Sequence, residues 1–239
     1  MKIRIRFGKY GALKFIGHLD MMRYFQKALR RAEIDMKYSE GFNPHMIMSF
    51  AAPLGVGITS DGEYFDIEVL SSEDSKTALK KLNDVMVEGV KVYSYRKLPD
   101  QAKTAMSIVA AADYELSFKE GYEIPKTLNE FQDMIVEFYE KSETIPIIKQ
   151  TKKSERELDL KPLIYDFKVL EREGKPVFYI KTSTGSVDNI KPELVLSAMY
   201  QKFGLEYRAE AIQIHRLDTY ARNEKDQFVP LEMLGEDIA

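Results

Sequence analysis

The sequence predicts an α+β protein built from two tandem ferredoxin-like units, each with the element order β-α-β-β-α-β. Two patterns support this prediction. Apolar residues that alternate with polar ones mark half-buried strands, and apolar residues at steps of three or four mark helices. The two patterns follow each other in the same order in both halves, which share no recognisable sequence identity. One continuous α+β domain with a large shared sheet is the alternative.

The first half accounts for six elements and predicts a domain over residues 1–98. Ile3, Ile5 and Phe7 alternate with charged residues in the first strand, and Glu73 and Asp74 suit the first turn of the second helix. The expected strands cover 2–7, 45–53, 63–70 and 90–95, and the helices 18–33 and 71–84. A polar connection at 98–104 follows as a domain boundary.

The second half repeats this order and predicts a domain over residues 108–222. Pro192 fits the first turn of its second helix, and Gly204 fits the end. The expected strands cover 113–118, 146–149, 177–181 and 211–217, and the helices 127–139 and 192–203. We expect the segment TKKSERELDLKP to be a charged connector and residues 223–239 to be a polar tail.

The alternation in the first domain also predicts what its open sheet face presents. Arg4 and Arg6, together with Tyr64, Tyr93 and Tyr95, would point away from the helices. Such a face resembles a platform on which RNA bases stack. The competing interpretation, which we favour, pairs Arg4 and Arg6 across strands with Asp66 and Glu68.

Composition excludes several classes of protein. Hydrophobic residues make up 44% and charged residues 31% of the chain, as in ordinary soluble proteins. No apolar run approaches 18 residues, and MKIRIRF reads as a strand and not as a signal peptide, so we expect a cytoplasmic protein without membrane association. The absence of cysteine excludes disulfides, thiolate metal sites and cysteine-ligated iron–sulfur clusters. We expect no cofactor and no metal.

Positive charge is concentrated at the start of the chain. Residues 1–31 contain nine Lys or Arg and a single acid, Asp20, although the whole chain carries −3. In the first predicted helix, four cations share one face away from the apolar stripe. Together with Lys14, they form a candidate anion- or RNA-binding face; a merely solvated helix surface is the alternative. The four are Arg23, Lys27, Arg30 and Arg31.

A polar loop follows the basic helix. Gly41 permits an unusual backbone conformation, and Asn43 before Pro44 favours a turn that ends at His45. We count Asn43 and His45 among the candidate binding residues. His18 and His45 are also candidate catalytic residues, because an RNA-cleaving enzyme needs a base or acid that titrates near neutral pH. A metal triad of His18, Asp20 and His45 is weaker, since a carboxylate in the first turn of a helix usually interacts with the helix itself.

Two segments resemble one protein family. They are FIGHLDMMRYFQKALRRAEIDMKYSEGFNPHMIMSFAAPLGVGITSDGEYFDIEV and KSERELDLKPLI, at residues 153–164. Both resemble the radical-SAM-linked protein family, a bacterial family of unknown function encoded beside, or fused behind, B12-binding radical SAM proteins. The resemblance implies a radical SAM protein as partner. It also makes Arg156, Glu157 and Asp159, which precede an apolar segment, candidates for a docking loop.

These observations favour an accessory protein that binds RNA or a partner and works with a radical SAM enzyme, with RNA modification as the expected context. Two alternatives stay open. One is an RNA-processing or RNA-modifying enzyme that uses His18 and His45, and the other is an adaptor that binds only proteins.

Overall fold

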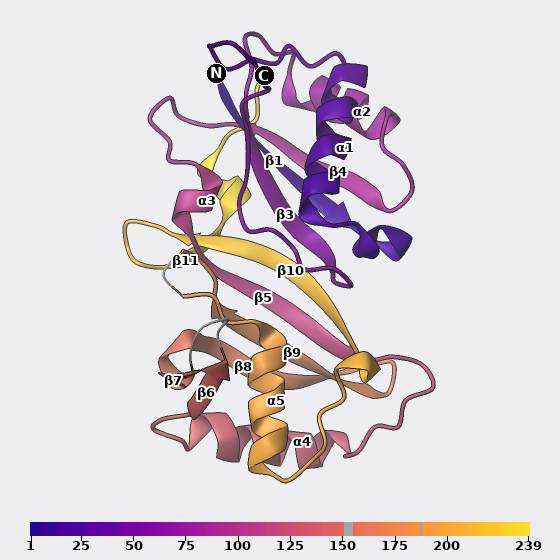
Figure 1. Cartoon of the computed structure of the whole chain (residues 1–239), viewed down its shortest axis with the longest axis vertical. Helices are drawn as coiled ribbons and strands as arrows, with labels where there is room; N and C mark the ends of the chain where they lie inside the picture. Colours follow the sequence, from indigo (N-terminus) through magenta and orange to yellow (C-terminus); the bar gives the residue numbers. More distant parts are fainter. Residues whose placement is uncertain (151–154, 187) are drawn as a thin grey trace. The chain divides into compact units, whose positions relative to one another are not determined.

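The structure is a computed structural model that describes residues 1–150, 155–186 and 188–239 (Figure 1). It divides into two compact units. Unit 1 comprises residues 1–111 and 216–239, and unit 2 comprises residues 112–215. Helices and antiparallel strands occur in both units, which confirms the predicted α+β class. The division between the units falls within β5 (Val109–Phe118) and β10 (Ile212–Arg222).

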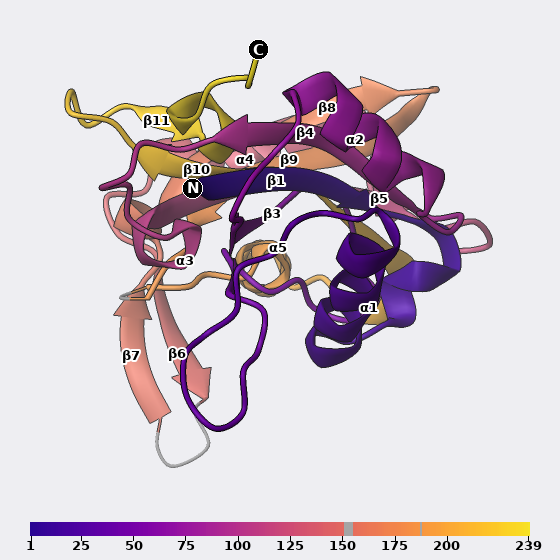
Figure 2. The ribbon, with the colours of Figure 1, turned by 90° about the horizontal axis from the view of Figure 1, so that it is seen from above.

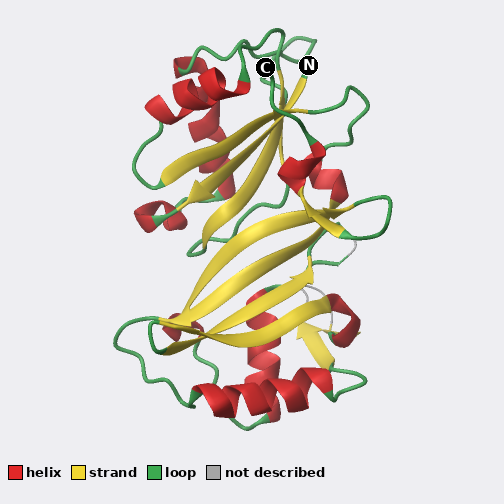
Figure 3. Cartoon of the chain, turned by 180° about the vertical axis from the view of Figure 1, so that it is seen from behind, coloured by secondary structure: helices red, strands yellow, loops and turns green. Residues whose placement is uncertain are grey.

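Unit 1 has the strand order of a ferredoxin-like unit. β1 lies between β4 and β3, β2 pairs with β3, and these pairs are antiparallel. The helices α1 and α2 pack on the same face of these strands (Figure 3). The elements are β1 (Lys2–Lys9), α1 (His18–Arg31), β2 (Met48–Phe50), β3 (Thr59–Glu68), α2 (Ser75–Asp84) and β4 (Val90–Lys97).

The core beneath α1 is aromatic. Phe25 of α1 packs edge-on against Phe7 of β1, with ring centroids 4.6 Å apart, and lies equally close to Phe65 of β3. Phe50 of β2 stacks on Phe65 at 5.1 Å. These four rings are all buried, so α1 is fixed against three strands by the side of the helix that the periodicity predicted.

The second helix begins later than predicted. α2 starts at Ser75, because the carboxylate of Asp74 accepts a hydrogen bond from the backbone N–H of Thr77 at 2.9 Å. Asp74 is therefore the N-cap residue and not a first-turn residue. Residues 71–74, which we expected to be helical, precede α2 and lie outside any helix.

The opposite face of the unit 1 sheet is covered, so the prediction of an open platform for RNA bases is wrong. Tyr64 is 2% exposed and packs with Ala105, Val109, Ala221 and Leu231. These residues come from α3 (Ala105–Ile108), the strand that follows it, β10, and the 3-10 helix Leu231–Leu234.

A bulge in β4 moves a second tyrosine of the expected platform. The register of β1 against β4 shifts between Arg6 and Phe7. Tyr95 consequently joins the core on the helix side, next to Ile3 and Ile5, and is 1% exposed. Strict alternation along the strand had predicted Tyr95 on the face away from the helices.

Residues 223–239, which we expected as a polar tail, belong to unit 1. β11 (Phe228–Pro230) pairs with the end of β10, and Leu231 is fully buried. The sequence did not predict this, because the segment is polar apart from one buried leucine. A single buried residue and a few backbone hydrogen bonds produce no periodic pattern in the sequence.

One of the two predicted cross-strand charge pairs is confirmed. Arg4 binds both carboxylate oxygens of Asp66, at 2.8 and 2.9 Å, and its side chain is 1% exposed. Arg6 instead pairs with Glu232 at 2.6 Å, and Glu68 pairs with Lys37 at 2.9 Å. Arg6 differs from the prediction because it faces the 3-10 helix Leu231–Leu234, which contains Glu232.

A close approach between two strands also constrains unit 1. A Cβ atom added at Gly62 of β3 would lie 2.4 Å from the Cα of Asp218 in β10. The side chain of Asp218 accepts a hydrogen bond from Tyr64 at 2.6 Å, and Thr219 donates to the carbonyl of Gly62. Only glycine fits at this contact.

Unit 2 also has a ferredoxin-like strand order, β10-β5-β9-β8. α4 and α5 lie on one face of these strands (Figure 3). α4 begins with the capping box of Thr127 and Glu130, and Pro192 occupies the first turn of α5 as predicted. The further elements are α4 (Leu128–Ile135), extended by a π-helical turn (Val136–Glu140), β6 (Pro146–Gln150), β7 (Glu155–Asp159), β8 (Ile164–Arg172), β9 (Lys175–Ser183) and α5 (Pro192–Lys202).

The second strand of unit 2 is not the one predicted. Residues 146–149, which we expected in the main sheet, form β6, which pairs with β7 in a separate two-stranded sheet. β7 lies in the segment TKKSERELDLKP, which we expected to be a connector. Residues 151–154 of that segment lie outside the described residues. β8 takes the sheet position instead and joins β9 through a two-residue turn in which Glu173 and Gly174 both have positive φ.

The buried pair Arg4–Asp66 yields a stability prediction. Asp66 also accepts the backbone N–H of Ala105 at 2.7 Å, so Asp66→Ala leaves a buried guanidinium and a buried amide without their acceptor. We expect a loss of roughly 3–5 kcal/mol in the free energy of unfolding, measured in urea. As the control, Glu68→Ala removes an exposed pair and should cost at most about 1 kcal/mol. Equal effects of the two substitutions would contradict this assignment.

Candidate functional site

The orientation of α1 decides where its cationic side chains lie. Its buried residues are Met21, Phe25, Ala28 and Leu29. At 3.6 residues per turn, the four predicted cations fall within an arc of about 100° on the opposite side of the helix. Burial of the apolar side against the sheet therefore directs these cations to solvent. We call Arg23, Lys27, Arg30 and Arg31 the α1 cationic face.

Most of the α1 cationic face lacks a carboxylate partner. Arg23 contacts Asp20 at 3.2 Å, in a pair in which both side chains are about two-thirds exposed. Lys27, Arg30 and Arg31 are exposed and form no ion pair with any residue that the structure describes. Arg30 and Arg31 lie in the last turn, where the helix dipole favours cations. The surface can accept an anion without breaking more than one weak contact.

Lys14 lies at the other end of α1. It belongs to a short 3-10 helix (Gly11–Phe15) that precedes the N-terminus of α1, and its Nζ lies 5.3 Å from the centre of the Phe15 ring. A 14-residue helix is about 21 Å long, so Lys14 is not part of the surface that Arg30 and Arg31 form. The sequence prediction had joined all five cations in one face.

The two candidate catalytic histidines have different environments. The ring of His18, at the start of α1, packs edge-on against Phe50 at 5.1 Å. His45, the residue directly before Met46, is exposed and contacts Ser39. Four extended residues, or about 13 Å, separate Met46 from Phe50, so the two rings do not meet. Among the described residues, no group of three or more His, Asp or Glu side chains could hold a metal ion.

The predicted polar loop forms a tight hairpin turn, which we call the 39–45 turn. The backbone N–H of Ser39 donates to the carbonyl of His45 at 2.8 Å. In return, the N–H of His45 donates to the Ser39 hydroxyl at 3.1 Å, and that hydroxyl lies 2.8 Å from Nδ1 of the His45 ring. Gly41 adopts a φ of 113°, as the motif predicted. Asn43 and His45 are exposed at this turn.

A buried ionic cluster lies beneath the N-terminus of α1, and the sequence analysis did not predict it. Glu63 of β3 accepts hydrogen bonds from Ser60 at 2.8 Å and from Arg216 at 2.9 Å. Lys9 of β1 is 3% exposed and donates to the carbonyl of Ile16 at 2.7 Å. Burial lowers the pKa of Lys9, and the charge of Glu63 opposes that shift.

This cluster supports two loops of the N-terminal motif. The carbonyl that Lys9 binds precedes α1, and Arg216 donates to the carbonyl of Ala52 at 2.8 Å. The cavity between Lys9, Glu63, His18 and the segment 50–54 measures only about 20 Å³. That volume holds one water molecule, so the cluster in this conformation positions loops and does not admit a substrate.

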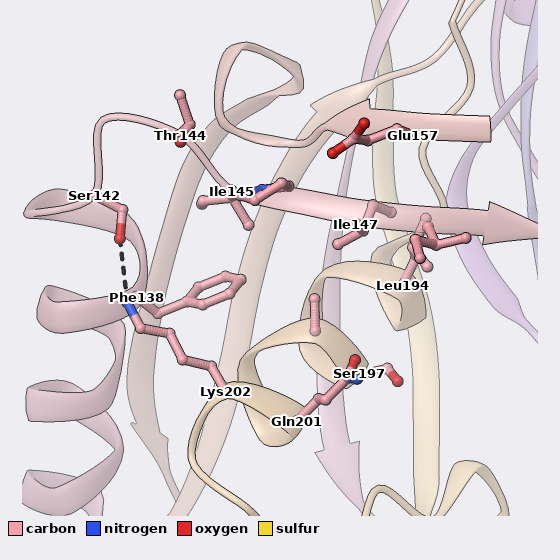
Figure 4. Close-up of a pocket in the computed structure, with 13 residues that line it drawn as sticks. Phe138, Ser142, Thr144, Ile145, Ile147, Glu157, Leu194, Ser197, Gln201 and Lys202 are labelled. Atoms are coloured by element: carbon pink, nitrogen blue, oxygen red, sulfur yellow. Dashed lines mark hydrogen bonds between the residues drawn. The ribbon is translucent and has the colours of Figure 1, made fainter.

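Unit 2 contains a separate groove of about 660 Å³ between β6 and α5 (Figure 4). Ile145, Ile147 and Leu194 form its apolar wall. At one end, Nζ of Lys202 donates to the hydroxyl of Ser142 at 3.2 Å, and Glu157 of β7 lies at the rim. The volume falls in the range of ligand-binding pockets.

The predicted docking loop is a strand instead of a loop. Arg156, Glu157 and Asp159 all lie in β7, paired with β6. Asp159 has a structural role, since its carboxylate accepts the N–H groups of Ile145 at 2.7 Å and Lys161 at 3.0 Å. Glu157 is exposed at the groove, and the side chain of Arg156 lies outside the described residues.

The chain belongs to a family described as an uncharacterized protein conserved in bacteria (DUF2344), whose model matches residues 2–192. The match confirms that the chain belongs to an uncharacterized bacterial family, and the link to radical SAM proteins stays a prediction. No curated protein shows significant similarity to the sequence. Among the described residues, no helix is long and apolar enough to cross a membrane.

One similar solved structure is titled "Crystal Structure of a Cbf5-Nop10-Gar1 Complex". The sequences are 12% identical, and the TM-score is 0.48. The match covers 93% of this chain and 50% of the other, so this chain spans half the length of the chain that it matches.

The buried ionic cluster yields a second prediction. Glu63→Gln removes the carboxylate that Arg216 and Lys9 share, while Glu63 and Arg216 have side chains only 5% and 7% exposed. We expect the free energy of unfolding to fall by roughly 3–5 kcal/mol, because a buried cation is left uncompensated. Glu88→Gln, at an exposed position, serves as the control. A change below about 1 kcal/mol at Glu63 would show that this carboxylate does not hold the loops.

Proposed function

We propose that this protein is an RNA-binding accessory protein, and that the α1 cationic face contacts the phosphates of the RNA. The observation that carries the proposal is the placement of four cations on the solvent side of one helix, with only Arg23 near a carboxylate among the described residues. Arg guanidinium groups bind phosphate oxygens in a bidentate manner, and three of the four cations are arginines.

The charge of the rest of the protein supports a local contact instead of a general one. The chain as a whole carries −3 at pH 7, so its net charge does not attract a polyanion. From Arg23 to Arg31 the α1 cationic face extends about 12 Å along the helix. A short stretch of sugar–phosphate backbone matches that length.

We also propose that the partner is a radical SAM protein. This part of the proposal rests on the family resemblance of the two motifs. The groove of unit 2 supports a docking role for that unit, because Glu157 from the second motif lies at its rim. A protein-only adaptor is the alternative that the experiment below separates. The catalytic alternative loses support because His18 and His45 contact different residues.

Charge reversal on α1 tests the proposal. Four phosphate contacts with single-stranded RNA predict a slope of roughly −3 in a plot of log affinity against log salt concentration. Arg30→Glu with Arg31→Glu should abolish binding of a 12-nucleotide RNA and leave thermal stability almost unchanged, because both side chains are exposed. Fluorescence anisotropy over a salt series measures the affinity and the slope.

The matched control changes the same amount of charge elsewhere. Lys76→Glu with Lys80→Glu alters two exposed cations of α2. We expect this control to retain RNA binding. Equal losses in both double variants would contradict a specific α1 site, and RNA affinity unchanged by Arg30→Glu with Arg31→Glu would overturn the proposal. Loss of binding to a radical SAM partner with RNA affinity intact would favour the adaptor.

A further inference from the structure

The tip of the 39–45 turn carries an aromatic side chain in full contact with water. Phe42 is 100% exposed, more than any other large apolar side chain among the described residues. Exposed phenylalanine is unfavourable in water, and its burial against a partner stabilises a complex. Nothing in the fold of unit 1 explains a phenylalanine at this position, because it contributes to none of the buried clusters.

The hairpin that carries Phe42 is closed at its base. The backbone and side-chain hydrogen bonds between Ser39 and His45 close the turn at its base, and the bridge between Tyr38 and Met46 continues the hairpin. A hairpin whose backbone is already closed loses less conformational entropy when its tip contacts a partner. The structure of the turn therefore favours binding at its tip.

The base of the hairpin is fixed to the same core as α1. Met36 and Met46, at the two sides of the hairpin, are buried together with Phe25 and Leu29 of α1. Figure 2 shows the hairpin projecting from unit 1 on the side on which α1 also projects. The position of the turn relative to α1 is therefore set by shared packing, and one RNA strand can contact both.

The chemistry of the exposed side chains in the turn matches a nucleobase. Aromatic rings stack on unpaired bases, and amide and imidazole groups form hydrogen bonds with base edges. Phe42, Asn43 and His45 supply these three groups on one short turn, and Glu40 is its only acid. An apolar pocket of a protein would also accept Phe42, but the α1 cationic face on the same unit favours a polyanion.

We infer that the 39–45 turn binds an unpaired base of the RNA by stacking it on Phe42, while the α1 cationic face holds adjacent phosphates. This inference rests on the proposed function and adds a substrate class to it. The preferred ligand is single-stranded RNA, or a loop with unpaired bases, because a base inside a duplex has no free face for stacking.

The absence of tryptophan from the chain provides a direct reporter. The Phe42→Trp variant carries a single indole, whose fluorescence is quenched when a base stacks on it. We expect quenching by a 12-nucleotide single-stranded RNA and none by an abasic oligonucleotide of the same length, which has the phosphates but no bases. Quenching of equal size with both oligonucleotides would contradict stacking.

Affinity measurements on Phe42→Ala separate stacking from phosphate binding. We expect a loss of roughly 5- to 150-fold for the single-stranded RNA, the range found for one stacked base. The slope against salt should stay the same, because no phosphate contact is removed. Phe42→Trp should retain affinity, and Met233→Ala, at another exposed apolar position of unit 1, serves as the control.

The outcomes distinguish the inference from the proposed function. If charge reversal on α1 abolishes binding but Phe42→Ala leaves the affinity unchanged, the proposed function stands and the stacking inference is wrong. If no variant of α1 or of the turn changes RNA affinity, both are wrong. If Phe42→Ala weakens binding to a protein partner and leaves RNA affinity unchanged, the turn contacts protein and the inference is overturned.

Discussion

Burial of one side of α1 against the strands of unit 1 is the constraint on which the candidate site depends. Phe25 contacts Phe7 and Phe65, each from a different strand, so the helix cannot rotate without opening the aromatic core. Since the helix has one apolar side, fixing that side also fixes the direction of its cations. The same packing holds the start of α1 over β2, where His18 meets Phe50. One side of α1 therefore packs in the core, and the opposite side carries the candidate binding residues.

The second face of the unit 1 sheet is closed by charge as well as by apolar contacts. Arg4 binds Asp66 in the interior and also donates to the carbonyl of Leu231 at 3.1 Å. A buried ion pair of this kind contributes little net stability compared with an apolar pair, but it fixes which segments cover it. Here Asp66 of β3 binds the backbone of Ala105, and Arg4 of β1 binds the backbone of Leu231. The sheet face itself is therefore not accessible to a ligand.

Local features of the fold could be predicted from the sequence, and features that depend on distant contacts could not. The α1 periodicity, the glycine in the 39–45 turn and Pro192 at the start of α5 are each set by neighbouring residues. β7 was missed because Leu158 is its only apolar residue, so the sequence of this short strand shows no alternation. The pair Glu63–Arg216 joins residues 153 positions apart, and no local pattern marks such a contact. The separation of His45 from His18 also depends on a non-local contact, the pairing of β2 with β3.

Amide chemical-shift mapping tests the central claim most directly, because it reports every contact surface at once without any substitution. The account predicts that titration of the whole chain with a 12-nucleotide single-stranded RNA shifts the amide resonances of residues 18–31 and 38–46 together, with the same saturation curve. Resonances of β8 and β9 should stay unchanged. Shifts confined to unit 2, or shifts of the two unit 1 segments that saturate at different RNA concentrations, would contradict a single RNA-binding surface on unit 1.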